Sequence, residues 1–278
     1  MQRYLGPILI AVVIFFGVNL VMGSSTGTNL IDIARGDVTP SAAPVFTDPP
    51  AEPSEPAGEP EMPAEEPTAP EQPAELSSAA QAALQALDGI DVTPATRIPA
   101  YNRKEQFTPG GKGTSWPDIA GTGCNTRDDI LAAQLTNVVR NEKCQVVTGT
   151  LDDPYTGNVI DFERDVTVNG KKVGGNSMAV QIDHKYPLKK FWEGGAWKWT
   201  LEERVAAAND PLNLVASDGP ANNFKSAKGP SEWMPSTSGN AAYDCTFATD
   251  VVTVLVKYDL TATKADIASL RSTLTTCA

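Results

Sequence analysis

The stretch from residue 38 to residue 76 limits most strongly what this chain can fold into. It contains eleven prolines interleaved with glutamate and alanine. Proline removes a backbone donor and fixes φ, and neighbouring glutamates repel one another, so such a segment cannot bury enough apolar surface to fold. We therefore expect an acidic, disordered linker over residues 24–96, broken only by a short helix over 77–87, and one folded domain over residues 97–278.

Charge is distributed unevenly along the chain. The formal net charge is −12, and residues 36–96 carry twelve acidic side chains and no lysine or arginine. Residues 97–278 carry 20 basic and 21 acidic side chains, so the expected domain is near neutral. The overall acidity therefore does not exclude nucleic acid as a ligand, because a near-neutral domain can bind phosphate through a local basic patch.

The first residues have the pattern of an export signal. Arg3 precedes Leu5–Met22, a run of 18 residues without a charged side chain. This run approaches the length of a bilayer span, and Val21-Met22-Gly23 offers a small-residue cleavage site. Residues 1–23 are thus either a cleaved signal peptide or an uncleaved anchor. In both cases we expect an exported domain, secreted or tethered, that meets the membrane only through this segment.

The four cysteines favour two disulfides, because an even number in an exported chain indicates an oxidising compartment. Their spacing is not the paired C-x-x-C of a zinc site. Three pairings are open from the sequence. The preferred one joins Cys124 to Cys144 and Cys245 to Cys277, since each cysteine then has its partner nearby in the chain.

Hydrophobic periodicity in residues 97–278 predicts helices and strands in the order of an α+β domain. Capping-box spacing marks two helix starts, Thr126 with Asp129 and Thr263 with Asp266. Strands are expected over 145–150, 159–162, 178–183 and 212–216. Helices are expected over 126–139, 201–208 and 222–228, with a closing pair over 246–257 and 263–275.

The lone histidine is the centre of the candidate chemistry. His184 follows Asp183 at the end of an expected strand, and Asn222 begins a short helix after the next strand. Strand, loop, strand and helix in this order bring the end of the first strand beside the start of the helix. Asp183 and Asn222 can then share one divalent cation through hard oxygen ligands, as Mg²⁺ prefers. His184 can activate a water for attack on a phosphodiester.

The ordered set Asp183-His184-x-x-Pro187, Asn213-Leu214 and Asn222-x-x-Lys225 resembles the HNH, or His-metal finger, nucleases. The longer stretch from Gln181 to Trp233 resembles secreted bacterial HNH-endonuclease family proteins in particular. The resemblance implies a ββα-metal core inside a mixed domain with a C-terminal helical pair. It implies that His184 is the general base, that Asp183 and Asn222 are metal ligands, and that Asn213 steadies the loop and orients the histidine.

Two features leave the cofactor and the substrate contacts open. The last position of the pattern is Asn222 and not histidine, so Mn²⁺ or another divalent ion remains an alternative to Mg²⁺. Lys225 is either structural or phosphate-facing, and Arg164 either contacts phosphate or forms an ion pair. A wider basic set forms either a phosphate-binding or a solvated face: Lys185, Lys189, Lys190 and Lys198.

We therefore predict a metal-dependent endonuclease that acts on DNA, with RNA as an alternative substrate. A near-neutral domain implies modest affinity and little sequence specificity. No feature of the sequence indicates an oligomer. Two alternatives remain: a cell-surface interaction protein with a catalytically degenerate HNH fold, and a hydrolase of cell-envelope phosphodiesters. Comparing plasmid, RNA and envelope polymer as substrates separates the three.

Overall fold

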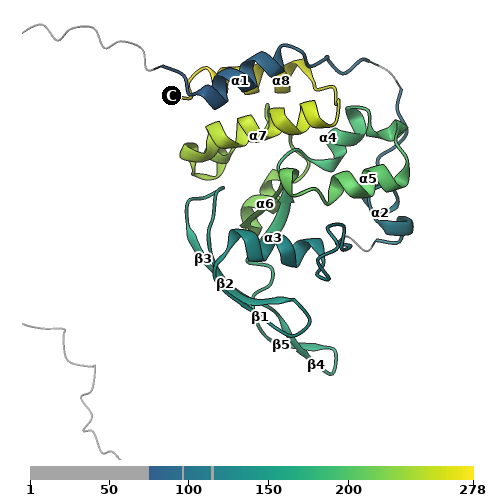
Figure 1. The fold of residues 1–278 in the computed structure, drawn as a ribbon, viewed down its shortest axis with the longest axis vertical. Coiled ribbons are helices and arrows are strands. Elements are labelled where there is room, and N and C mark those ends of the chain that lie inside the picture. Colours follow the sequence, from purple (N-terminus) through teal and green to yellow (C-terminus); the bar gives the residue numbers. More distant parts are fainter. Residues whose placement is uncertain (1–74, 96, 114–115) are drawn as a thin grey trace, which may run out of the picture. The chain divides into compact units, whose positions relative to one another are not determined.

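The computed structural model describes residues 75–95, 97–113 and 116–278 (Figure 1). The expected export segment and most of the expected linker lie outside these residues. The chain divides into two units, Met1–Glu66 and Pro67–Ala278, and every element below belongs to the second. In the described part of the chain, no helix is both long and apolar enough to cross a membrane.

The second unit has a mixed α+β fold with small antiparallel sheets and C-terminal helices, as the sequence predicts. The helices are α1 (Ser78–Leu87), α2 (Arg103–Gln106), α3 (Thr126–Gln134), α4 (Leu188–Glu193), α5 (Leu201–Ala208), α6 (Gly219–Lys225), α7 (Asp244–Lys257) and α8 (Lys264–Leu274). The strands are β1 (Thr136–Arg140), β2 (Val146–Asp152), β3 (Val159–Glu163), β4 (Val166–Val168), β5 (Lys171–Gly174), β6 (Val180–His184) and β7 (Leu214–Asp218).

Helices α1, α7 and α8 pack on one another at one end of this unit (Figure 1). The Ser77 side chain caps α1, and the Ser77 N–H donates to the carbonyl of Cys277 at 3.0 Å. Three side chains of α1 are buried against the two later helices: Ala80, Ala83 and Leu87. The packed unit therefore includes a helix that lies before the domain boundary expected at residue 97.

Residues 97–113, the N-terminal strap, run from this helical layer across α4 and α5. Trp192 donates from Nε1 to the carbonyl of Pro99 at 2.8 Å, and Arg204 donates from Nε to the carbonyl of Gln106 at 2.8 Å. The ring of Phe107 is buried and packs edge-on against Trp192. Apolar packing and hydrogen bonds from two helices thus fix the strap that carries α2.

Three small antiparallel sheets form the rest of the unit. Strands β1, β2 and β3 are adjacent in that order, β4 pairs with β5, and β6 pairs with β7. Helix α3 packs on β2, β6 and β7. A second apolar core lies between α3 and these strands and contains Ile130, Leu131, Val146 and Ile182 among others. The β6–β7 pair therefore has a packed apolar support on one side.

Both disulfides have the preferred pairing. Cys124 is bonded to Cys144, which ties the segment before α3 to the turn between β1 and β2. Cys245 is bonded to Cys277, which ties the start of α7 to the segment just after α8. One covalent link therefore lies before the β6–β7 pair in the chain and the other after it, and neither encloses it.

Some element boundaries differ from the predictions. The helix expected over 126–139 ends at Gln134, because Leu135 has extended backbone angles and the next five residues pair with β2. Its cap is Asn125 and not Thr126. Helix α6 begins three residues earlier than expected, because Asp218 caps it and Pro220 occupies its first turn.

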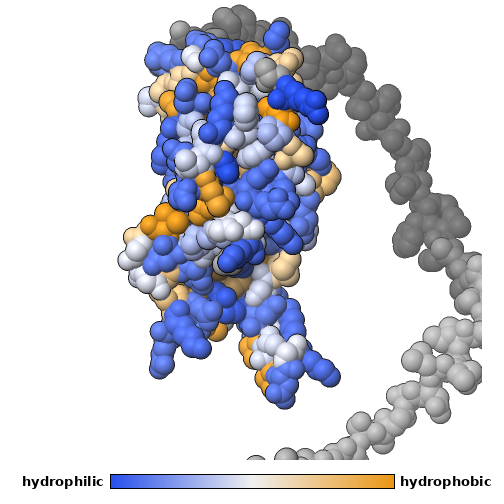
Figure 2. Space-filling view, turned by 90° about the vertical axis from the view of Figure 1, so that its right-hand side faces the viewer, coloured by the Kyte–Doolittle hydropathy of each residue, from blue (hydrophilic) through white to orange (hydrophobic). Residues whose placement is uncertain are grey.

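Figure 2 shows one face of this unit, on which hydrophilic residues predominate and hydrophobic residues gather in separate patches. Several large apolar side chains are exposed, among them Val159, Val173, Met178 and Phe224. Scattered apolar side chains of this kind are normal on a protein surface. The hydropathy of this face therefore does not mark a binding site.

Candidate active site

Strands β6 and β7 and helix α6 form one continuous unit that carries the candidate residues. The strands pair from Val180 with Asp218 to His184 with Leu214, and α6 follows β7 directly. A Cβ at Gly219 would lie 2.1 Å from the carbonyl oxygen of Met178, so only glycine allows α6 to start this close to β6. This close approach brings Asn222 of α6 beside the end of β6.

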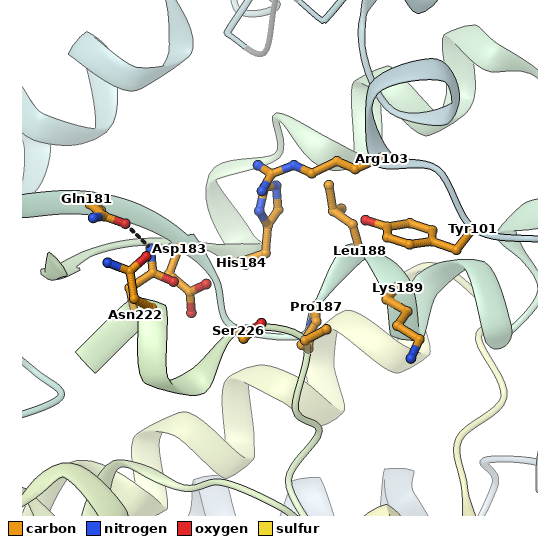
Figure 3. A pocket seen from close by; sticks show the side chains of 12 residues that line it. Tyr101, Arg103, Gln181, Asp183, His184, Pro187, Leu188, Lys189, Asn222 and Ser226 are labelled. Carbon is orange, nitrogen blue, oxygen red and sulfur yellow. Dashed lines mark hydrogen bonds between the residues drawn. The ribbon is translucent and has the colours of Figure 1, made fainter. Parts of the chain in front are cut away.

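A pocket of about 340 Å³ opens at this junction (Figure 3). Asn222 donates from Nδ2 to Oε1 of Gln181 at 2.9 Å, which orients the amide and leaves its Oδ1 for another partner. Asp183 lies next to Asn222 in Figure 3, and His184 lies further along the same wall. The other residues that line the pocket are Tyr101, Arg103, Pro187, Leu188, Lys189, Asn223, Ser226 and Ala227.

The two oxygens of Asp183 have different surroundings. Oδ2 accepts a hydrogen bond from the hydroxyl of Tyr155 at 2.7 Å and lies 2.8 Å from Nζ of Lys225. Burial, and after it the Asp183 charge, raise the pKa of Tyr155 well above its ordinary value, so the hydroxyl stays a donor. Both of these contacts to the Asp183 carboxylate are made with Oδ2. Oδ1 is therefore the oxygen left to bind a ligand.

His184 is buried, and one ring nitrogen is already committed. Its Nε2 lies 2.7 Å from the carbonyl oxygen of Ala208. A carbonyl only accepts, so Nε2 carries the hydrogen and Nδ1 of the neutral ring keeps a lone pair. Burial, followed by the nearby charge of Arg103, lowers the pKa of His184 to about 3. Trp116 stacks parallel to the imidazole, with the ring centroids 6.0 Å apart. The side chain is thus a neutral base in a fixed orientation.

Asn213 joins the start of β7 to the loop that follows β6. The side chain is fully buried. Its Oδ1 accepts from the backbone N–H of Tyr186 at 2.8 Å, and its Nδ2 donates to the carbonyl of Tyr186 at 2.9 Å. The Asn213 carbonyl also accepts from the N–H of Lys185 at 2.8 Å. These bonds hold the backbone just after His184, and Asn213 itself does not line the pocket.

The three basic residues expected at the substrate are bonded to protein groups instead. Lys225 is fully buried, and its Nζ contacts Asp183 and the carbonyl of His184. Lys185 pairs with Asp250 at 2.7 Å, and Arg164 pairs with Asp128. A buried charge needs such partners because it has lost its water. None of the three lines the pocket, and their role in substrate binding stays a prediction.

Two residues of the strap line the pocket, where the three basic residues do not. Tyr101 and Arg103 line the pocket together with Lys189 of α4 (Figure 3). Lys189 belongs to the basic set noted in the sequence. Tyr101 and Arg103 carry no such signal, because they precede His184 by about eighty residues. Only the path of the strap brings them to the site.

The donors in the pocket fit a hydrated divalent cation. Asp183 and Asn222 each offer one oxygen, and both are hard ligands of the kind that Mg²⁺ or Mn²⁺ binds. Among the described residues, no group of three or more His, Cys, Asp or Glu side chains is placed to hold a metal ion. The set therefore suits a cation that keeps several waters, and not a closed four-ligand zinc site.

Comparison with known proteins gives two matches. Residues 125–272 match the family described as GmrSD restriction endonucleases, C-terminal domain. A protein of Arthroderma benhamiae named "uncharacterized secreted protein" is 33% identical over 200 residues, which cover 71% of this chain and 86% of that protein. No solved structure matches the chain. The family match includes β6, β7 and α6 and begins after the strap.

Proposed function

Because the chain belongs to the family of GmrSD restriction endonuclease C-terminal domains, we propose that it is a metal-dependent endonuclease that hydrolyses phosphodiester bonds in DNA. The observation that carries the proposal is the pocket in which a neutral histidine, a carboxylate oxygen and an amide oxygen lie on adjacent elements. We further propose that β6, β7 and α6 are the ββα-metal core of an HNH-type nuclease.

In this proposal His184 is the general base. Its Nε2–H donates to Ala208, so Nδ1 accepts the proton of a water that attacks phosphorus. The low pKa of His184 keeps the ring neutral at ordinary pH, which supports this role. Asn213 is a positioning residue, since it bonds to the backbone of Tyr186 two residues beyond the histidine.

Asp183 and Asn222 would hold the divalent cation, with Mg²⁺ or Mn²⁺ as the best fit. When bound, such a cation supplies positive charge to the phosphate oxygens and to the leaving oxygen. Tyr155 and Lys225 hold Oδ2 of Asp183, so the carboxylate has one orientation before any cation arrives. Gln181 does the same for the amide of Asn222.

We also propose that the protein acts outside the cell or on its outer surface. The two disulfides fit an oxidising compartment. The relative in Arthroderma benhamiae is named a secreted protein. Whether residues 1–23 are removed or remain as an anchor is decided by sequencing the N-terminus of the exported protein.

The test is cleavage of supercoiled plasmid by the exported chain. We expect nicking and then linearisation with Mg²⁺ or Mn²⁺, and none in EDTA. His184→Ala, purified in parallel, should be about 10²–10⁴-fold slower, which also excludes a contaminating nuclease. RNA of equal length is the comparison substrate. A folded wild type that cleaves neither polymer with either ion overturns the proposal and favours a degenerate site.

A further inference from the structure

Arg103 is a charged side chain at the pocket that the proposed catalytic set does not use. It lies in α2, is exposed, and lines the pocket next to His184 (Figure 3). Among the described residues, its guanidinium has no carboxylate within ion-pair distance and no hydrogen-bond acceptor. Basic side chains elsewhere around the site, such as Lys185 and Lys225, are each paired with an aspartate. Arg103 therefore has its donors free at the pocket.

The backbone that carries Arg103 is fixed on both sides. Before it, the carbonyl of Pro99 accepts from Trp192, and after it, the carbonyl of Gln106 accepts from Arg204. Within α2, the N–H of Asn102 donates to Oε1 of Gln106 at 2.6 Å. Phe107 is 1% exposed and closes the segment against the core. The strap thus presents a free guanidinium from a fixed position, which reduces the entropy cost of binding.

Charge near the pocket favours an anion. Asp183 is already balanced by Lys225. Lys189 lies 3.7 Å from Glu193, but the lysine is exposed and the glutamate only half-buried, so that pair is weak. Arg103 therefore leaves the pocket locally positive in a chain whose net charge is −12. An arginine fork matches the paired oxygens of a phosphate.

We propose that Arg103 binds the phosphate that is cleaved, by donating N–H bonds to its non-bridging oxygens. This step rests on the proposed function. A water gives its proton to Nδ1 of His184 and forms the new P–O bond. The ester P–O bond breaks, its leaving oxygen takes a proton from solvent, and Arg103 keeps its own protons throughout. The strap, which lies outside the family match over residues 125–272, then completes the active site.

The test uses two substrates on the full exported chain, with Mg²⁺ or Mn²⁺. One is plasmid DNA, and the other is bis(4-nitrophenyl) phosphate, which has a single phosphodiester. Arg103→Ala should lower kcat/KM about 10- to 100-fold on both, as loss of one transition-state donor does. Arg103→Lys should recover part of the loss, because it keeps the charge without the fork. Lys104→Ala is the matched control: it is exposed in the same helix, and its stem lies beside Gly113.

The outcomes separate this proposal from the proposed function. A loss on plasmid alone means that Arg103 binds a distant phosphate, and an equal loss for Lys104→Ala means a general charge effect; either result overturns the proposal. A wild type inactive on both substrates overturns the proposed function instead. Binding of a fluorescent DNA duplex in EDTA then still tests Arg103. Arg103→Ala should bind more weakly, with a salt slope smaller by about one than that of Lys104→Ala. Wild-type binding by Arg103→Ala overturns the contact.

Equal thermal unfolding temperatures are expected for the wild type and the three variants. Arg103 makes no side-chain hydrogen bond to the described residues, so its replacement removes no contact that supports the fold. If Arg103→Ala is nevertheless unstable, Arg103→Gln keeps the length of the side chain and takes its place in both assays. A folded Arg103→Gln with wild-type kcat/KM on both substrates also overturns the proposal.

Discussion

Lys225 shows, at the scale of one residue, how a contact can differ from the role that a motif implies. As the last residue of the Asn222-x-x-Lys225 pattern, it is compatible with a phosphate contact. In the fold its ammonium is fully buried between Asp183 and the carbonyl of His184. The lysine therefore balances the charge of the carboxylate before a cation binds. It joins the two adjacent residues proposed for metal binding and proton transfer.

The division of labour between ligands and base can be measured. Asp183→Ala and Asn222→Ala should weaken binding of Mn²⁺ as well as cleavage, because each removes an oxygen donor. His184→Ala should bind Mn²⁺ nearly as the wild type does while cleavage falls. Isothermal titration calorimetry of the variants, with cleavage rates, gives both quantities. Asn158→Ala, at an exposed asparagine that does not line the pocket, is the control for the titration.

Asp183→Ala also leaves Lys225 buried without its counter-charge, so its fold must be checked by circular dichroism. Asp183→Asn keeps the shape of the side chain and serves if the alanine variant unfolds. The assignment of roles is rejected if His184→Ala loses the ion while Asp183→Ala keeps it.

The titration of the histidine can be observed directly, because His184 is the only histidine in the chain. Burial, and then Arg103, lower its pKa to about 3, so the folded protein takes up this proton far below the ordinary value of 6.5. NMR should therefore show unchanged imidazole shifts from about pH 8 to about pH 5, with the nitrogen pattern of the Nε2–H tautomer. The unfolded chain in urea should titrate near 6.5 and is the control.

The low pKa of His184 also makes the stability of the fold depend on pH. Between the two pKa values the unfolded chain binds the proton and the folded chain does not, so the fold loses stability as pH falls through this window. A folded-state midpoint between about 6 and 7 would contradict the buried, neutral histidine.

At the scale of elements, local patterns located the helix at 201–208 and four strands: β2, β3, β6 and β7. They missed β1, β4 and β5 and the boundaries that depend on other elements. The expected helix over 126–139 ended early because pairing with β2 competes for the residues from Thr136 onward. Helix α1 was recognised as a helix but assigned to the linker. Its burial depends on α7 and α8, which lie more than 150 residues later. Composition around α1 could not reveal that contact.

Helix α1 should be required for stability. Leu87 is 1% exposed in the core with α7 and α8, so Leu87→Ala should lower the free energy of unfolding by about 2–5 kcal/mol. Gln85→Ala, on an exposed position of the same helix, should change it by less than about 0.5 kcal/mol. Urea unfolding followed by circular dichroism measures both.

Truncation gives a second reading of the same contact. A chain of residues 75–278 should match the full chain in stability and cleavage, because it keeps α1. A chain of residues 97–278 should be less stable, because it lacks this helix. Equal stability of the two truncated chains would show that α1 contributes nothing to the fold.

At the scale of the whole molecule, the sequence predicted which residues form the central set but not what surrounds them. Asp183, His184 and Asn222 line one pocket because strand, strand and helix follow one another closely in the chain. Arg103 and Tyr101 reach the same pocket through contacts of the strap with α4 and α5. Lys185 and Arg164 form ion pairs with aspartates that are distant in sequence. Long-range contacts of this kind leave no local pattern.

The hydrogen bond between the Ser77 N–H and the carbonyl of Cys277 places the residue before α1 beside a residue just after α8. When the two ends of a folded unit lie this close together, they can be joined and the chain opened at another point, and the contacts inside the unit stay the same. The same unit can thus be carried at the end of a host protein or inserted as a closed loop between two host residues. Gene fusion can relocate the whole site without altering its interior.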